Sequence, residues 1–151
     1  MGIYQYIGLA AVSSLSISVG AFVAAQSEEE LKDGVKYIKT LIAILSYLAM
    51  LLTARELISN ILLSAFIPTI LILITFYISR IFRNYIFLVF LGVCFSVVNK
   101  NIPNYLISSL IFITGICIGS MIYYSDRNRL YSSISLKTGF FIFISLVLLF
   151  I

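Results

Sequence analysis

The residues of this sequence that could do chemistry are polar side chains set within long apolar runs. Arg55 and Glu56 are the charge pair best able to enter a membrane, where an ionisable group marks a functional site by default. Pro68 cannot donate a hydrogen bond to the carbonyl of Ser64, so it frees a polar backbone atom inside an apolar segment. Transporters often build substrate sites on such interrupted helices. The sequence thus offers a candidate transport path lined by Ser13, Ser16, Tyr47, Glu56, Ser64 and Pro68.

The same residues also fit plain structural roles, which the sequence favours. Proline kinks occur in ordinary helix packing, where a nearby hydroxyl such as that of Thr69 can satisfy the backbone. Arg55 and Glu56 fit the membrane surface better than its interior, with the arginine extending its charged end into water. Whether this pair lies at the surface or within the membrane is left open by the sequence.

Several kinds of chemistry are excluded by composition. The chain has no histidine, which excludes imidazole metal sites and histidine acid–base catalysis. Cys94 and Cys117 lie on different apolar segments, at depths that differ by roughly 12 Å at 1.5 Å per residue. A disulfide needs Cα atoms within about 7 Å, so we expect two free, buried thiols. We therefore expect no catalytic residue, no metal and no cofactor, and an enzyme only if groups such as Tyr47 or Ser64 acted unusually.

The overall composition indicates that this protein lies in a membrane and not in water. Of 151 residues, 62% are hydrophobic and 11% are charged, against about 25% charged in an ordinary soluble domain. A soluble fold of this size cannot bury so much apolar surface, and disorder requires the opposite composition. The run Ile70–Leu73 is apolar without alternation, which argues against a membrane barrel. We predict an all-α integral membrane protein in the cell membrane of a prokaryote, with the lipid bilayer as its first partner.

Apolar segments of about 20 residues, the length that spans a bilayer, cover most of the chain. The residues before the first segment carry no Lys or Arg, so we expect a span there and not a cleaved signal peptide. The result is a single domain, residues 1–151, that forms a compact bundle with short loops. Its six predicted spans are 3–25, 36–54, 58–79, 84–99, 104–124 and 136–151.

The basic residues predict the orientation of this bundle. Short cytoplasmic loops carry an excess of Lys and Arg. The even loops hold only Arg55 and Lys100. Both termini should therefore lie on the non-cytoplasmic side, and the scattered charges give no sign of nucleic-acid binding. The other eight basic residues fall at the odd loops: Lys32, Lys36, Lys39, Arg80, Arg83, Arg127, Arg129 and Lys137.

The first loop has a readable local pattern. Ser27 and Glu30 match a capping box, and Gly34 suits a helix end, which together predict a short interfacial helix. The acidic residues at its start suit the positive end of the helix dipole. They are a candidate cytoplasmic docking site, although a solvated face is the commoner role for such a cluster: Glu28, Glu29 and Glu30.

Small residues predict which helix faces pack together, because small faces allow close approach of helices in lipid. We expect these faces at the centre of the bundle. Most tyrosines, Tyr6 among them, fall near predicted membrane interfaces, where the hydroxyl stays hydrated. The candidate packing positions are Ala10, Ser14 and Ser18 in the first span, Gly92 and Ser96 in the fourth, and Gly115 and Gly119 in the fifth.

Two classes of function remain open. The first is a non-enzymatic structural or accessory subunit that binds other membrane subunits or itself. The second is a small transporter or channel that uses the candidate path. Convergence of the path residues on one internal site favours transport, whereas a filled centre favours the subunit.

Overall fold

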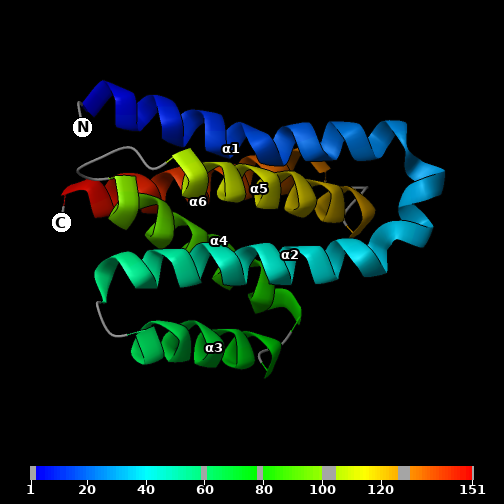
Figure 1. The fold of residues 1–151 in the computed structure, drawn as a ribbon. Coiled ribbons are helices and arrows are strands. Elements are labelled where there is room, and N and C mark those ends of the chain that lie inside the picture. The colour runs from blue at the N-terminus through cyan, green and yellow to red at the C-terminus, as the bar shows by residue number, and fades with distance from the viewer. Residues whose placement is uncertain (1–2, 59–60, 78–79, 100–104, 126–129, 151) are drawn as a thin grey trace.

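Helices account for nearly all of the residues that the computed structural model describes, which are 3–58, 61–77, 80–99, 105–125 and 130–150 (Figure 1). The predicted all-α class is therefore confirmed. The described residues form six helices: α1 (Ile3–Gln26), α2 (Glu28–Leu57), α3 (Ile61–Tyr77), α4 (Arg80–Asn99), α5 (Tyr105–Ser125) and α6 (Leu130–Phe150).

Four of these helices are long and apolar enough to cross a membrane, which indicates an integral membrane protein. Within the described residues, α3 and α4 contain shorter apolar segments, Leu62–Leu71 and Leu88–Val98. The four long candidate spans are Tyr4–Gln26, Glu28–Leu57, Tyr105–Ser125 and Tyr131–Leu148.

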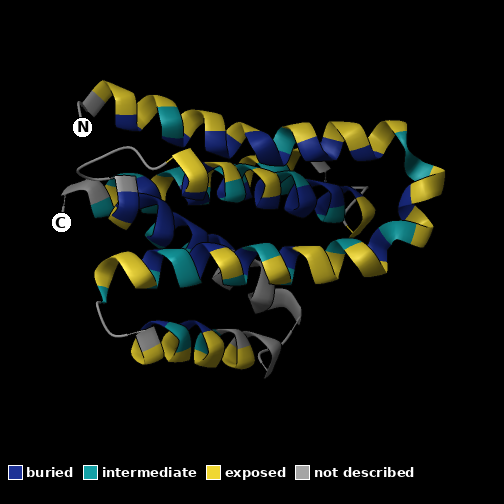
Figure 2. Cartoon of the chain, viewed as in Figure 1, coloured by how far each residue is buried: buried dark blue, intermediate teal, exposed yellow. Residues whose placement is uncertain are grey.

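Helix α5 is the centre of the arrangement, because it packs against α1, α2, α4 and α6. Helix α2 lies between α5 and α3, so α3 forms one edge of the molecule (Figure 1). Both ends of the chain lie at the same end of the bundle, and α1 therefore runs antiparallel to α6. Buried residues face inward on each helix, and exposed ones, which are largely apolar, cover the outside (Figure 2).

The closest packing in the protein is between α1 and α5. A methyl group added at Gly20 would overlap the backbone carbonyl of Ile116, and one added at Gly119 would overlap the carbonyl of Ile17. The Ser120 hydroxyl, on the same face of α5, donates across this contact to the Gly20 carbonyl at 3.0 Å. The two backbones are therefore in direct contact, and the partner of the Gly115–Gly119 pair is α1 of the same chain.

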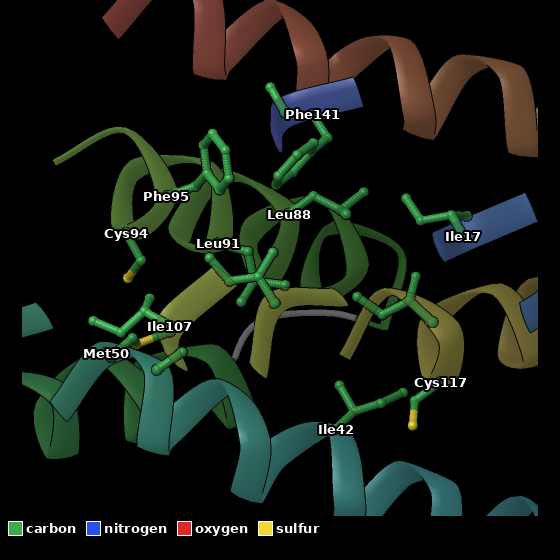
Figure 3. Close-up of a cluster of buried hydrophobic side chains, with 14 of the residues drawn as sticks. Ile17, Ile42, Met50, Leu88, Leu91, Cys94, Phe95, Ile107, Cys117 and Phe141 are labelled. Atoms are coloured by element: carbon green, nitrogen blue, oxygen red, sulfur yellow. The ribbon is translucent and has the colours of Figure 1, made fainter. Parts of the chain in front are cut away.

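Larger side chains fill the space around this contact. Figure 3 shows side chains from α2, α4, α5 and α6 pointing toward one another. Most of these side chains are branched or aromatic, and those of α4 come from the segment Leu88 to Phe95. The labelled members are Ile17, Ile42, Met50, Leu88, Leu91, Cys94, Phe95, Ile107, Cys117 and Phe141.

The predicted interfacial helix before the second span is wrong. Helix α2 begins at Glu28 and continues unbroken through Gly34 to Leu57. A glycine inside a helix costs about 1 kcal/mol. Burial of Leu31 and Val35 against α1 and Tyr123 offsets that cost. The capping box does not form either, because the Ser27 hydroxyl bonds the Val23 carbonyl at 3.2 Å and makes no side-chain cap.

The chain reverses direction after α2, as expected because residues 36–79 are too long for a single span. Helix α2 ends at Leu57, and Ile58 takes an extended conformation with its N–H bonded to the Ala54 carbonyl.

The predicted position of Lys137 at the fifth loop is wrong. Helix α6 is already formed at Leu130, so Lys137 lies inside the helix and is only 4% exposed. Arg127 and Arg129 lie outside the described residues.

The α1–α5 contact makes a direct prediction for stability. Gly119→Ala should lower the free energy of unfolding in detergent by about 1–3 kcal/mol, because the new methyl forces the two backbones apart. Gly139→Ala is the matched control, since a methyl there meets nothing within 4 Å. Denaturant titration followed by circular dichroism measures both. Equal stability of the two variants would contradict the backbone contact.

Candidate functional site

The serines of α1 that were candidates for a transport path lie in its contact with α5. Ser13 and Ser16 are both buried. The Ser16 hydroxyl donates to the Ser13 carbonyl at 2.5 Å and occupies the space that a side chain at Gly115 would need. The hydroxyl of Ser16 is thus used within its own helix and serves the close packing.

Three further path residues lie on α2 and α3, and one of them joins the two helices. Ser64 and Pro68 are buried, and the Tyr47 hydroxyl lies 3.5 Å from the Thr69 hydroxyl. Thr69 also donates to the Ala65 carbonyl at 2.8 Å. Helix α3 continues through Pro68, so the proline does not end it.

The charged candidates lie at the two ends of α2. Arg55 and Glu56 are exposed in its last turn. Glu29 and Glu30 are exposed in its first turn, and Glu28 is half-buried, with one carboxylate oxygen 3.4 Å from the donating hydroxyl of Tyr123. The acidic cluster therefore has one member packed against α5 and two facing outward.

The candidate packing residues are mostly buried. Ser18 is half-buried, whereas the others have little or no exposure. A methyl group at Gly92 would lie 2.9 Å from a side-chain carbon of Ile144, so α4 approaches α6 closely at this point. The buried members are Ala10, Ser14, Gly92, Ser96, Gly115 and Gly119.

Sequence reasoning missed a polar and aromatic cluster at the junction of α1, α4 and α6. Tyr6 is 1% exposed, and its hydroxyl donates to the Ser145 carbonyl of α6 at 2.6 Å. The rings of Tyr6 and Phe95 meet edge to face at 5.4 Å, and those of Phe95 and Phe141 at 6.0 Å. The Ser96 side chain also reaches the Tyr6 hydroxyl. The spacing of Tyr6, Ala10 and Ser14, four residues each, was the signal that could have placed Tyr6 on a buried face.

Three buried hydroxyl oxygens in the described part of the chain have no hydrogen-bond partner. They belong to Ser46 on α2 and to Thr138 and Ser145 on α6. Buried polar atoms are normally satisfied, so each exception calls for an explanation. Two of the three lie on α6, the helix that also carries the buried Lys137.

Metal and thiol chemistry find little support within the described residues. Cys94 and Cys117 are both free and buried, as expected, and Figure 3 shows them on different helices. Among the described residues, no group of three or more Cys, Asp or Glu side chains could hold a metal ion. The two thiols therefore act as small core side chains.

Comparison of the chain with known protein families, with curated proteins and with solved structures found no match. The function must therefore be inferred from the residues of the chain itself.

The Tyr6 cluster predicts a measurable stability contribution. Tyr6→Phe should lower the free energy of unfolding by about 1 kcal/mol, because hydrogen bonds between helices in membranes contribute amounts of that order. Tyr4→Phe is the control, since Tyr4 is 88% exposed. Chemical unfolding in detergent compares the two. If both variants match the unsubstituted protein, the bond from Tyr6 to Ser145 contributes nothing to the bundle.

Proposed function

We propose that this protein is a non-enzymatic structural or accessory component of a membrane assembly, formed with other membrane subunits or with further copies of itself. The observation that carries the proposal is the separation of the candidate path residues. Ser13 and Ser16 are used in the contact between α1 and α5, while Tyr47 meets Thr69 of α3, the helix that also carries Ser64 and Pro68. A transport path through all of them would have to connect the contact between α1 and α5 with α3, which has no substantial contact with either helix among the described residues.

The exposed surface of the bundle also supports this proposal. Large apolar side chains cover the outward face of α3, among them Leu62, Phe66 and Leu73. Such a face suits lipid or the helix of a partner, since membrane helices associate through close packing. Helix α3 contacts only α2 and α4 to a substantial extent within the described residues, so much of its surface stays available.

We further propose that all six helices span the membrane of a prokaryotic cell, with both termini on the non-cytoplasmic side. The turn between α1 and α2 then faces the cytoplasm. Lys32, Lys36 and Lys39 support this orientation, because they are exposed near that end of α2. Basic residues near span ends favour the cytoplasmic side.

Cysteine labelling tests this orientation. In a background with Cys94 and Cys117 replaced by alanine, Asp33→Cys should resist a membrane-impermeant maleimide on intact cells and react after lysis. Leu57→Cys, at the opposite end of α2, should react on intact cells. Asp33 and Leu57 are both exposed, so access of the reagent reports the side of the membrane. The reverse labelling pattern would overturn the orientation.

The assembly proposal predicts the mass of the purified protein. After extraction in a mild detergent, light scattering should give a protein mass clearly above the 16.9 kDa of one chain. Mass spectrometry then distinguishes further copies of this chain from a second protein, and either supports the proposal. A single chain with no partner contradicts it.

Transport is the alternative function, through the path near Pro68, Glu56 and the serine-rich α1. It requires solute flux into proteoliposomes that falls with Glu56→Gln or Pro68→Ala. The exposure of Glu56 and the distribution of the path residues argue against it.

A further inference from the structure

We propose that two exposed lysines of α2, Lys36 and Lys39, bind the phosphate headgroup of an anionic phospholipid. This site goes beyond the structural role proposed above and does not depend on it, or on which side of the membrane the lysines lie. Three observations carry the proposal: the exposure of the two lysines on adjacent turns, their depth in the membrane, and the exposed apolar surface that follows them along the helix.

Lys36 and Lys39 lie on one side of α2. A spacing of three residues places them about 60° apart around the helix and about 4.5 Å apart along it. Both are exposed, whereas Leu31 and Val35 of the same stretch are buried in a cluster with Tyr123 of α5. The lysines therefore point away from the bundle, and their ammonium groups are close enough to share one phosphate.

The depth of the two lysines follows from their neighbours. Tyr105 and Tyr124 are exposed near the two ends of α5, and the helix between them is about 28 Å long. The hydrocarbon core of a bilayer is about 30 Å thick, and tyrosine favours its two surfaces. Ile38, between the lysines, packs against the cluster that contains Tyr123, and Tyr37 is 77% exposed. The lysines therefore lie at the membrane surface marked by Tyr124, where lipid phosphates are found.

An exposed apolar surface follows the lysines along α2. Leu41, Ile44 and Leu48 are each at least 40% exposed, and their spacings of three and four residues place them on one face. They lie beyond Tyr37 toward the other end of the helix, which is the direction of the hydrocarbon core. An acyl chain can pack along them while its headgroup stays at the lysines. A soluble anion gains nothing from this surface, so the arrangement favours a lipid.

The charges along α2 favour a negative headgroup at this position. Between Asp33 and Arg55, Lys36 and Lys39 are the only charged residues of the sequence. The acidic cluster Glu28–Glu30 ends about 9 Å before Lys36, close to the distance over which 0.1 M salt screens a charge. Asp33 is nearer and weakens the attraction.

A third exposed lysine, Lys32, is left out of the site. It lies within one turn of Glu28, Glu29 and Asp33, whose charges offset its own. The site therefore begins where the acidic residues end, at Lys36.

Native mass spectrometry of the purified protein tests the site. The protein in a neutral detergent is titrated with phosphatidylglycerol, and phosphatidylcholine with the same acyl chains is the reference. We expect the first phosphatidylglycerol to bind about tenfold more tightly, because each lysine near anionic lipid contributes a factor of about five and Asp33 opposes them. Lipids are counted per protein chain in any assembly, so failure of this site and failure of the structural role are distinguishable.

Variants assign the binding to this place in the fold. Lys36→Gln combined with Lys39→Gln should bind the two lipids equally well. Arg55→Gln is the matched control, because it removes an exposed cation at the other end of the same helix, and it should keep the preference. Asp33→Asn should strengthen phosphatidylglycerol binding about twofold, since it removes the nearest opposing charge. All four positions are exposed, so the fold should tolerate these changes.

Three results would overturn the proposal. The first is equal affinity of the unsubstituted protein for the two lipids, which needs no variant to fold. The second is a preference for phosphatidylglycerol that survives loss of both lysines. The third is displacement of phosphatidylglycerol by an equal concentration of inorganic phosphate, which would show a site for free anions and not for a lipid.

Discussion

The close approach of α1 and α5 is the contact on which the rest of the bundle depends. In lipid, apolar side chains gain nothing by leaving solvent, so helices associate through tight packing and hydrogen bonds. Gly20, Gly115 and Gly119 allow the two backbones to touch, and a serine hydroxyl fills the space at Gly115. Because α5 also contacts α2, α4 and α6, its position against α1 determines where those helices lie.

Most hydroxyl groups of the core are of two kinds, those bonded within their own helix and those bonded to another helix. Most donate to a carbonyl three or four residues earlier in their own helix, as Ser16, Thr53 and Thr114 do. Such bonds satisfy the hydroxyl without linking helices. Tyr6 and Ser120 are different because they donate across helices, at 2.6 and 3.0 Å. The unpartnered hydroxyls of Ser46, Thr138 and Ser145 belong to neither group.

The sequence predicts the all-α class well because an apolar run long enough to span a membrane has few alternatives to a helix. It fails where a local signal competes with tertiary packing. Gly34 has the residue type of a helix end, yet burial of its neighbours Leu31 and Val35 keeps α2 continuous. Tyr6 has the residue type of an interface, yet its hydroxyl finds a carbonyl on a helix 139 positions away, which no local pattern reveals. The candidate path also failed because residue type does not reveal which helix a side chain faces. Ser16 and Tyr47 are both polar residues on apolar helices, but Ser16 faces α5 and Tyr47 faces α3.

Lys137 was the most misleading residue for the same reason. Counted as a loop charge it supports an orientation, but within α6 it raises the question of what a lysine adds to a core. The aromatic cluster of Tyr6, Phe95 and Phe141 already packs this junction and locks α6 against α1. The lysine lies one turn from this junction on the same helix, so the packing of α6 against the bundle, and not the local sequence, decides that it is buried.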